Sequence, residues 1–405
     1  MRWQPALRAP TGRIERMDEP AAEPTPRPRR RLPAVVVGGS AILLVAIVVL
    51  GSTLATRGRP TVTLRPSGLP EPSVSVPLPG SAATGYLVEP ADLAERVRRA
   101  KAGDQPLAGA LAELVADADA ALPPQPRPTP NLEIPDTEGP FVDDTATAYG
   151  LALAYAATGE VRYAEGAKAY IQAWVQTTSQ LTNACASGGG CQTSLIVARV
   201  VPGFVFAADL IRPARVMTVA DETALRAWLH DLILPILPTR DGNWGDAGNF
   251  ARAVLTDYLG DRDGFASALD EWRTRLDAVP ADGHLPDEVR RGKDGMSYSQ
   301  EALQYKLGTA RLAELRGVDL WSYVGKGGAS LRTAVDLVAS YWFNPAAWPW
   351  DSAVRVPNPS PMWEIAYQHW QAAAWPAIFA PDRPFGLEGH SAIRWTTLTN
   401  GTKAD

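Results

Sequence analysis

Apolar residues recur at spacings of three and four over most of the chain after residue 90, which is the pattern of amphipathic helices. The runs predict helices over residues 91–102, 107–121, 143–157, 160–178, 194–211, 220–237, 244–259, 261–278, 298–316, 329–343 and 361–378. No run of alternating strand residues interrupts them, so no strand is expected in this region. Candidate first helices begin about 50 residues apart, near 143, 194, 244 and 298. A helical-hairpin repeat of that length predicts an all-α toroid or solenoid.

A second apolar pattern, without periodic polar positions, precedes this region. The run Leu32–Thr56 carries no charge and is long enough to cross a hydrocarbon core of roughly 30 Å as a helix. Arginines are more numerous before it than after it, which predicts a cytoplasmic N-terminus. Cleavage after Ala55, as in a secretory signal, is the alternative.

These patterns divide the chain into four parts. Residues 1–31 are predicted to be a disordered cytoplasmic tail rich in Arg and Pro, and 32–56 a single transmembrane anchor. Residues 57–82, rich in Pro and Ser, are predicted to be an extended linker, and 83–405 an extracellular helical domain. The expected location is therefore the cell membrane, with a single-pass topology.

The distribution of charge along the chain limits the kinds of partner that it can bind. The chain has a formal net charge of -5, but its tail and linker are basic, so residues 83–405 are strongly acidic. That distribution argues against nucleic acid as a partner. An anionic ligand would have to be held by a local basic patch.

The cysteines and histidines carry two further predictions. Cys185 and Cys191 lie in the loop NACASGGGC, and an extracellular domain favours a disulfide between them, with two free thiols as the alternative. The four histidines form neither an HxH nor an HExxH pattern; they are His230, His284, His369 and His390. No catalytic metal and no cofactor are expected.

Candidate chemistry gathers where two helices are predicted to begin. Asn243 precedes the run 244–259, and Ser297 precedes the next, with Gln300 three residues on in a capping-box spacing. Tyr298 would then be the first helical residue. Three cations lie just upstream, namely Arg290, Arg291 and Lys293. Helix N-termini and arginines together predict a site for a carboxylate.

The same stretch resembles the alginate lyase family, polysaccharide lyases with an (α/α) toroid fold. That family has an Asn-His pair opening one helix, a segment like the DGHLPDEVRRGK found here, and a catalytic tyrosine seven residues after its arginine. Asn243, Arg291 and Tyr298 fit this pattern, with family-like spacings of 48 and 7 residues. Trp244 replaces the family's histidine. The likeness extends over roughly residues 87–399 and implies an incomplete (α/α) barrel of helical hairpins.

The resemblance implies β-elimination on a uronate-containing, alginate-like polysaccharide. Neutralising the uronate carboxylate makes the C5 proton acidic, and this role falls to Asn243 and Arg291. Tyr298 would act as base and then as acid on the leaving oxygen. Because the usual histidine is missing, Tyr298 acting alone in a syn elimination is the preferred mechanism. The further substrate-binding candidates are Arg290, Lys293, Trp244 and His284.

Other interpretations stay open. Asn243 could be only a helix cap, Arg291 a partner of Glu288, and Tyr298 a half-buried helix-start aromatic. A glycoside hydrolase on an (α/α) barrel would need two catalytic carboxylates, and the available acids are Asp246, Glu288, Glu301 and Asp351. A glycan-binding envelope protein that lost catalysis with the histidine is a third possibility.

Overall fold

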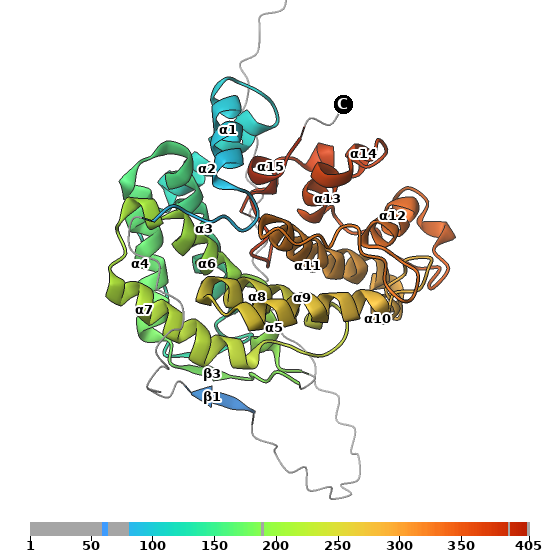
Figure 1. Ribbon diagram of the computed structural model, residues 1–405, viewed down its shortest axis with the longest axis horizontal. Helices are drawn as coiled ribbons and strands as arrows, with labels where there is room; N and C mark the ends of the chain where they lie inside the picture. Colours follow the sequence, from blue (N-terminus) through green and yellow to red (C-terminus); the bar gives the residue numbers. More distant parts are fainter. Residues whose placement is uncertain (1–58, 64–80, 188–189, 388, 403–405) are drawn as a thin grey trace, which may run out of the picture. The chain divides into compact units, whose positions relative to one another are not determined.

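The computed structural model describes residues 59–63, 81–187, 190–387 and 389–402. The predicted tail (1–31), the predicted anchor (32–56) and most of the predicted linker (57–82) lie outside the described residues. The longer helices in chain order are α1 (Pro90–Lys101), α2 (Leu107–Ala120), α3 (Glu138–Thr158), α4 (Val161–Thr177), α5 (Gln192–Val200), α6 (Pro202–Leu210), α7 (Val219–Trp228), α8 (Asn243–Leu259), α9 (Arg262–Asp277), α11 (Gly295–Leu315), α12 (Leu331–Trp342) and α13 (Met362–Trp370). Three short ones are α10 (Pro286–Val289), α14 (Pro376–Phe379) and α15 (Thr396–Thr399) (Figure 1).

The helices form two layers within Arg57–Asp405. Helices α3, α6, α8, α11 and α13 contact one another in succession, and α4, α7, α9 and α12 pack on their outer side. α8 is buried at nearly every position, whereas α9 buries only the stripe Ala268, Leu269, Trp272 and Leu276. A helix that is apolar on one stripe covers a core, and one buried all round lies within it. This arrangement is the predicted (α/α) pairing of helical hairpins.

Tight turns connect the members of a hairpin. α3 ends at Gly159 and α8 at Gly260, and both glycines have positive φ values of 79° and 72°. A left-handed residue closes a helix and reverses the chain, and glycine adopts it without strain. The second helix of each pair therefore folds back antiparallel on the first.

Aromatic rings join the inner helices to one another. Phe206 of α6 contacts Phe250 of α8 at 6.5 Å between ring centroids, and Phe250 contacts Tyr305 of α11 at 6.1 Å. Tyr149 of α3 meets Phe206 at 5.4 Å. The two contacts of Phe206 are edge-to-face and that of Phe250 with Tyr305 is tilted, and such ring contacts add to the burial of large apolar area. The row joins the middle of α8 to the middle of α11, the two helices that carry the site described below.

The expectation that the region after residue 90 has no strands is wrong. β2 (Asn131–Glu133) pairs in parallel with β3 (Gln180–Thr182), and β1 (Thr61–Thr63), within the range expected to be a linker, pairs antiparallel with β3. Each strand has three residues, too few for alternation to stand out.

Three predicted helices are also interrupted. The run 220–237 is α-helical only as α7 and continues in a π turn over Leu229–Ile233 and a 3-10 turn over Leu234–Ile236. The run 194–211 divides into α5 and α6 at Pro202, which lacks an N–H donor. The run 361–378 stops at Gln371, whose φ is 49°, before α14 begins. Among the described residues the stretch Gln192–Ala214, which includes α5 and α6, is long and apolar enough to cross a membrane, but it is largely buried inside the domain.

The predicted disulfide between Cys185 and Cys191 is confirmed. It joins the loop after β3 to the residue that precedes α5. The two cysteines are 6 residues apart, so the cross-link removes little entropy from the unfolded chain, worth about 2 kcal/mol. Its main effect is local, on the loop between β3 and α5.

Candidate active site

The start of α8 is held by a carboxylate from another element. Gly242, with φ of 76°, precedes the helix, and a Cβ there would lie 2.7 Å from Glu288 Oε1. That same oxygen accepts a hydrogen bond of 2.5 Å from the backbone N–H of Asn243. A helix N-terminus has unpaired N–H groups and partial positive charge. Glu288 on α10 therefore caps α8 from outside.

Asn243 is not the cap that the sequence suggests. It is the first residue of α8, and its side chain makes no capping bond. The side chain is fully buried, and neither Oδ1 nor Nδ2 has a hydrogen-bond partner among the described residues. Unpaired buried amides are rare because they lose their hydrogen bonds to water. This amide is thus available to a ligand or water.

Arg291 and Tyr298 lie together beside this helix start. The guanidinium of Arg291 stacks on the Tyr298 ring with 4.7 Å between Cζ and the centroid. Its Nε lies 3.8 Å from Glu288 Oε2, so the two form an ion pair. Glu288 therefore links Asn243 to Arg291, and Arg291 links Glu288 to Tyr298. The three residues that the sequence predicted are joined through a fourth.

The predicted capping box at Ser297 is wrong. A 3-10 turn over Gly292–Asp294 leads directly into α11, which begins at Gly295. Gln300 instead receives hydrogen bonds from the N–H of Ser360 and from Trp363 Nε1. Tyr298 is consequently the fourth residue of α11, still in the first turn, and is half-buried.

Burial raises the pKa of Glu288 to about 7, and the nearby Asp246 carboxylate adds to the rise while the Asn243 N–H opposes it. A carboxyl whose folded-state pKa is raised keeps its proton in the folded chain after the unfolded chain has released it. The free energy of unfolding should therefore fall by roughly 3 kcal/mol as the pH increases from about 4.5 to about 7, and then level off.

The variant Glu288→Gln should lose this dependence, because its amide does not titrate. Melting temperatures of both proteins, measured at several pH values between roughly 4 and 8, would check the prediction. Parallel curves for the two proteins would contradict it.

Beneath the start of α8 lies a buried ion pair. Lys306 Nζ of α11 lies 2.6 Å from Asp246 Oδ1 of α8, and the two side chains are only 4% and 6% exposed. Removing one member of such a pair leaves an uncompensated buried charge, which is strongly destabilising. The pair fixes α8 against α11 just below the Asn243–Glu288–Arg291–Tyr298 cluster.

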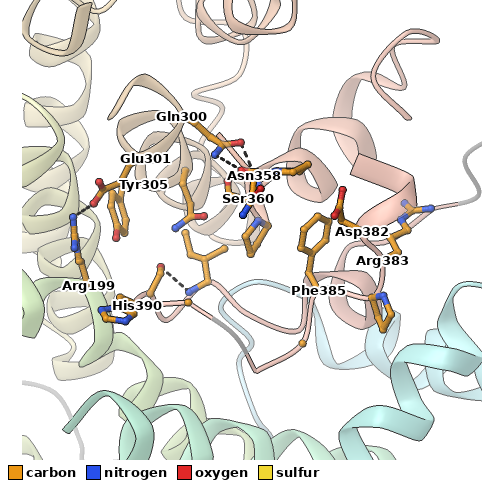
Figure 2. Close-up of a pocket in the computed structure, with 18 of the residues that line it drawn as sticks. Arg199, Gln300, Glu301, Tyr305, Asn358, Ser360, Asp382, Arg383, Phe385 and His390 are labelled. Carbon is orange, nitrogen blue, oxygen red and sulfur yellow. Dashed lines mark hydrogen bonds and ion pairs between the residues drawn. The ribbon is translucent and has the colours of Figure 1, made fainter. Parts of the chain in front are cut away.

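A cleft of about 720 Å³ opens on the adjoining face of α11. Glu301 and Tyr305 line it, one and two turns after Tyr298, and Arg199 of α5 pairs with Glu301 (Figure 2). Burial lowers the pKa of Arg199, but Tyr305, Glu301 and Tyr298 outweigh it and raise that pKa. Ser297, the residue before Tyr298, also lines the cleft.

The remaining predicted residues lie apart from the cluster or face water. Trp244 is nearly buried, with Arg240 Cζ 4.8 Å from its ring. His284 pairs with Asp282 at 2.7 Å and packs on Trp350.

Two of the predicted cations are also solvent-exposed. Arg290 pairs with Asp287 and is 71% exposed, and Lys293 is exposed in the turn before α11. Neither contacts the cluster through an interaction among the described residues.

Sequence reasoning missed the roles of Glu288, Lys306 and Arg199. Glu288 was considered only as a partner of Arg291 or as a hydrolase acid. A signal existed for Arg199, a single cation inside the apolar run SLIVARVVPGFVF. Buried cations in apolar helices are almost always paired. The sequence does not show which carboxylates they meet.

Comparisons with known proteins show which family and which solved structures the chain resembles. A family model described as alginate lyase matches residues 126–348, and no curated protein matches the chain. An alginate lyase structure from Bacteroides ovatus aligns with a TM-score of 0.62 at 18% identity, covering 80% of this chain and 100% of that one. Alginate lyase A1-III from Sphingomonas species A1 aligns with a TM-score of 0.62 at 16% identity, covering 83% and 100%.

A further structure is a tyrosine-to-phenylalanine variant of alginate lyase A1-III complexed with a tetrasaccharide, with a TM-score of 0.62 at 15% identity, covering 80% and 97%. These likenesses confirm the (α/α) toroid fold predicted for the helical domain. Fold and family match together define a polysaccharide lyase. The chain belongs to the alginate lyase family.

Proposed function

We propose that this chain is a membrane-anchored extracellular lyase that cleaves a uronate-containing polysaccharide by β-elimination, with Tyr298 transferring the protons. The observation that carries the proposal is the linked cluster. Asn243, Arg291 and Tyr298 come from two separate stretches of sequence, and Glu288 holds them together through the contacts to the Asn243 N–H and to Arg291.

The cluster supplies what β-elimination needs at the carboxylate. Arg291 is 37% exposed, so its guanidinium is accessible to an entering uronate. The Asn243 amide is buried and unpartnered among the described residues, so it reaches the carboxylate once the covering groups shift. When the uronate carboxylate is bound by both Arg291 and Asn243, it can accept the negative charge that develops when C5 loses its proton.

Tyr298 then moves the proton. As phenolate it takes the C5 proton, the C5 electron pair forms the C4–C5 double bond, and the C4–O4 bond breaks. The same hydroxyl returns its proton to O4, which leaves Tyr298 as phenolate and the product unsaturated. The guanidinium of Arg291 stacks on the Tyr298 ring and holds it in place beside the helix start. Trp244 offers no proton-transfer group where the family has histidine.

His369 and His284 are badly placed to help, whereas His390 lines the cleft but pairs with Glu138 at 3.2 Å. His369 pairs with Glu314, sixteen residues beyond Tyr298 on the same helix, a distance of about 24 Å at 1.5 Å per residue. His284 lies against Trp350 and Asp282. The syn mechanism with Tyr298 alone therefore remains the one we propose.

The test is a screen of the detergent-solubilised full chain against uronate polysaccharides. A lyase produces new ultraviolet absorbance from the unsaturated sugar together with new reducing ends. New reducing ends without absorbance would mean a hydrolase. Binding without either signal would mean a glycan-binding protein and would overturn the proposal.

The anchor is a second part of the proposal. It is supported by the uncharged run 32–56 and the arginines before it. Protease added to intact cells should remove the helical domain and leave the N-terminal tail intact. Protection of the domain together with digestion of the tail would show the opposite orientation.

A further inference from the structure

The cleft beside Tyr298 has a wall that the predicted site does not use. Ser297, Glu301 and Tyr305 of α11 form one side. The other side comes from residues 358–361, 382–386 and 389–393, far along the chain (Figure 2). Glu301 follows Tyr298 by about one helical turn, roughly 5 Å along the axis of α11. A sugar next to one bound at Tyr298 would therefore extend toward this cleft.

The cationic side chains that line the cleft are each paired with a carboxylate. Arg199 pairs with Glu301. Arg383 makes two hydrogen bonds, of 2.7 and 2.6 Å, to the carboxylate of Glu364, which is fully buried. His390 pairs with Glu138 at 3.2 Å. Each cationic side chain among the described lining residues thus already has its carboxylate.

The balance of the lining is negative. Arg199 and Arg383 of the lining stand against the carboxylates of Glu301 and Asp382. The Glu364 partner of Arg383 adds a third carboxylate behind the wall. A second uronate placed here would meet paired arginines and like charges. Like-charge contacts in a partly desolvated site discriminate against a ligand.

The uncharged groups of the lining suit sugar hydroxyls instead. Gln304 and Asn358 present amides, and Phe385 presents an apolar ring (Figure 2). The Ser360 hydroxyl is buried without a hydrogen-bond partner among the described residues. Amides, hydroxyls and an aromatic face are the groups that bind neutral sugars.

We infer that this cleft takes an uncharged sugar next to the uronate at Tyr298, so that the substrate alternates uronate with neutral or N-acetylated sugars rather than being a uronate homopolymer. This inference rests on the proposed function and narrows its substrate class. Asp382 and the two arginine–carboxylate pairs would set the preference.

The experiment compares two substrates with the detergent-solubilised full chain. One is a mannuronate homopolymer and the other hyaluronan, in which uronate alternates with an N-acetylated sugar, at equal uronate concentration. The expected result is a kcat/KM at least about tenfold higher on the alternating polymer. A preference for the homopolymer overturns the inference and leaves the lyase activity standing, whereas absence of unsaturated product from either sinks the proposed function.

Binding provides a readout that does not depend on turnover. Oligosaccharides of both polymers are titrated calorimetrically into the Tyr298→Phe chain, and tighter binding of the alternating one is expected. Equal or tighter binding of the homopolymer contradicts the inference even if neither polymer is cleaved.

Changing a charged residue in the wall of the cleft tests whether its charge causes the substrate preference. Asp382→Lys should tighten homopolymer binding roughly two- to fivefold and leave the alternating oligosaccharide nearly unaffected. Asp263→Lys, an exposed position on α9 outside the cleft, is the matched control for the net charge. An equal gain in both variants would show long-range attraction only and would reject the role of the cleft.

Discussion

Replacing Tyr298 by phenylalanine is expected to lower kcat by roughly 10²-fold or more on a polysaccharide that the wild type cleaves. The ring and its stacking with Arg291 at 4.7 Å are retained, and only the hydroxyl that carries the proton is lost. KM should change little, because the hydroxyl acts in the transition state. Initial rates from the absorbance of the unsaturated product would measure both constants.

Two comparisons separate chemistry from structure. Tyr155→Phe removes a hydroxyl from a half-buried tyrosine on α3 and should leave the rate unchanged. Arg291→Ala should raise KM and lower kcat together, since the uronate carboxylate is present in both the ground state and the transition state. A Tyr298→Phe enzyme with a near wild-type rate would mean that the tyrosine is packing and that another group is the base.

The repeat and the main helices could be predicted from sequence because helical periodicity is a local signal that each run carries by itself. The predicted helix boundaries were wrong where a proline or a turn changed the backbone within or beside an apolar run. Pro202 interrupts an apolar run, and a 3-10 turn moves the start of α11 from Ser297 to Gly295. Three-residue strands such as β2 leave too few positions for a pattern.

The site could be predicted only in part, for a related reason. The motif spacing pointed to Asn243, Arg291 and Tyr298, but the contacts that join them depend on tertiary structure. Glu288 reaches across to α8, a partnership over 45 residues of sequence. Arg290 and Lys293 carry the same charge as Arg291, yet Arg290 at the end of α10 and Lys293 in the turn before α11 are exposed to solvent. Side-chain direction at a loop is set by backbone turns that composition does not encode.

The largest stability effect is expected from Lys306→Met. This substitution keeps most of the side-chain volume but removes the ammonium that lies 2.6 Å from Asp246, where both side chains are almost wholly buried. Breaking a buried pair from one side leaves an uncompensated charge, which costs about 3–5 kcal/mol. The unpaired Asp246 would also act on Glu288, whose pKa it already raises, so the start of α8 should loosen first.

Denaturation followed by circular dichroism would measure the loss. Lys326→Met is the matched control, because Lys326 pairs with Asp277 at 2.7 Å but is 86% exposed, and exposed ion pairs contribute little to stability. The double variant Asp246→Leu/Lys306→Met should recover most of the stability, since no charge is then left buried. If Lys306→Met unfolds no more easily than Lys326→Met, the buried pair does not hold α8 against α11, and the position of Asn243 must instead depend on Glu288 and the aromatic row.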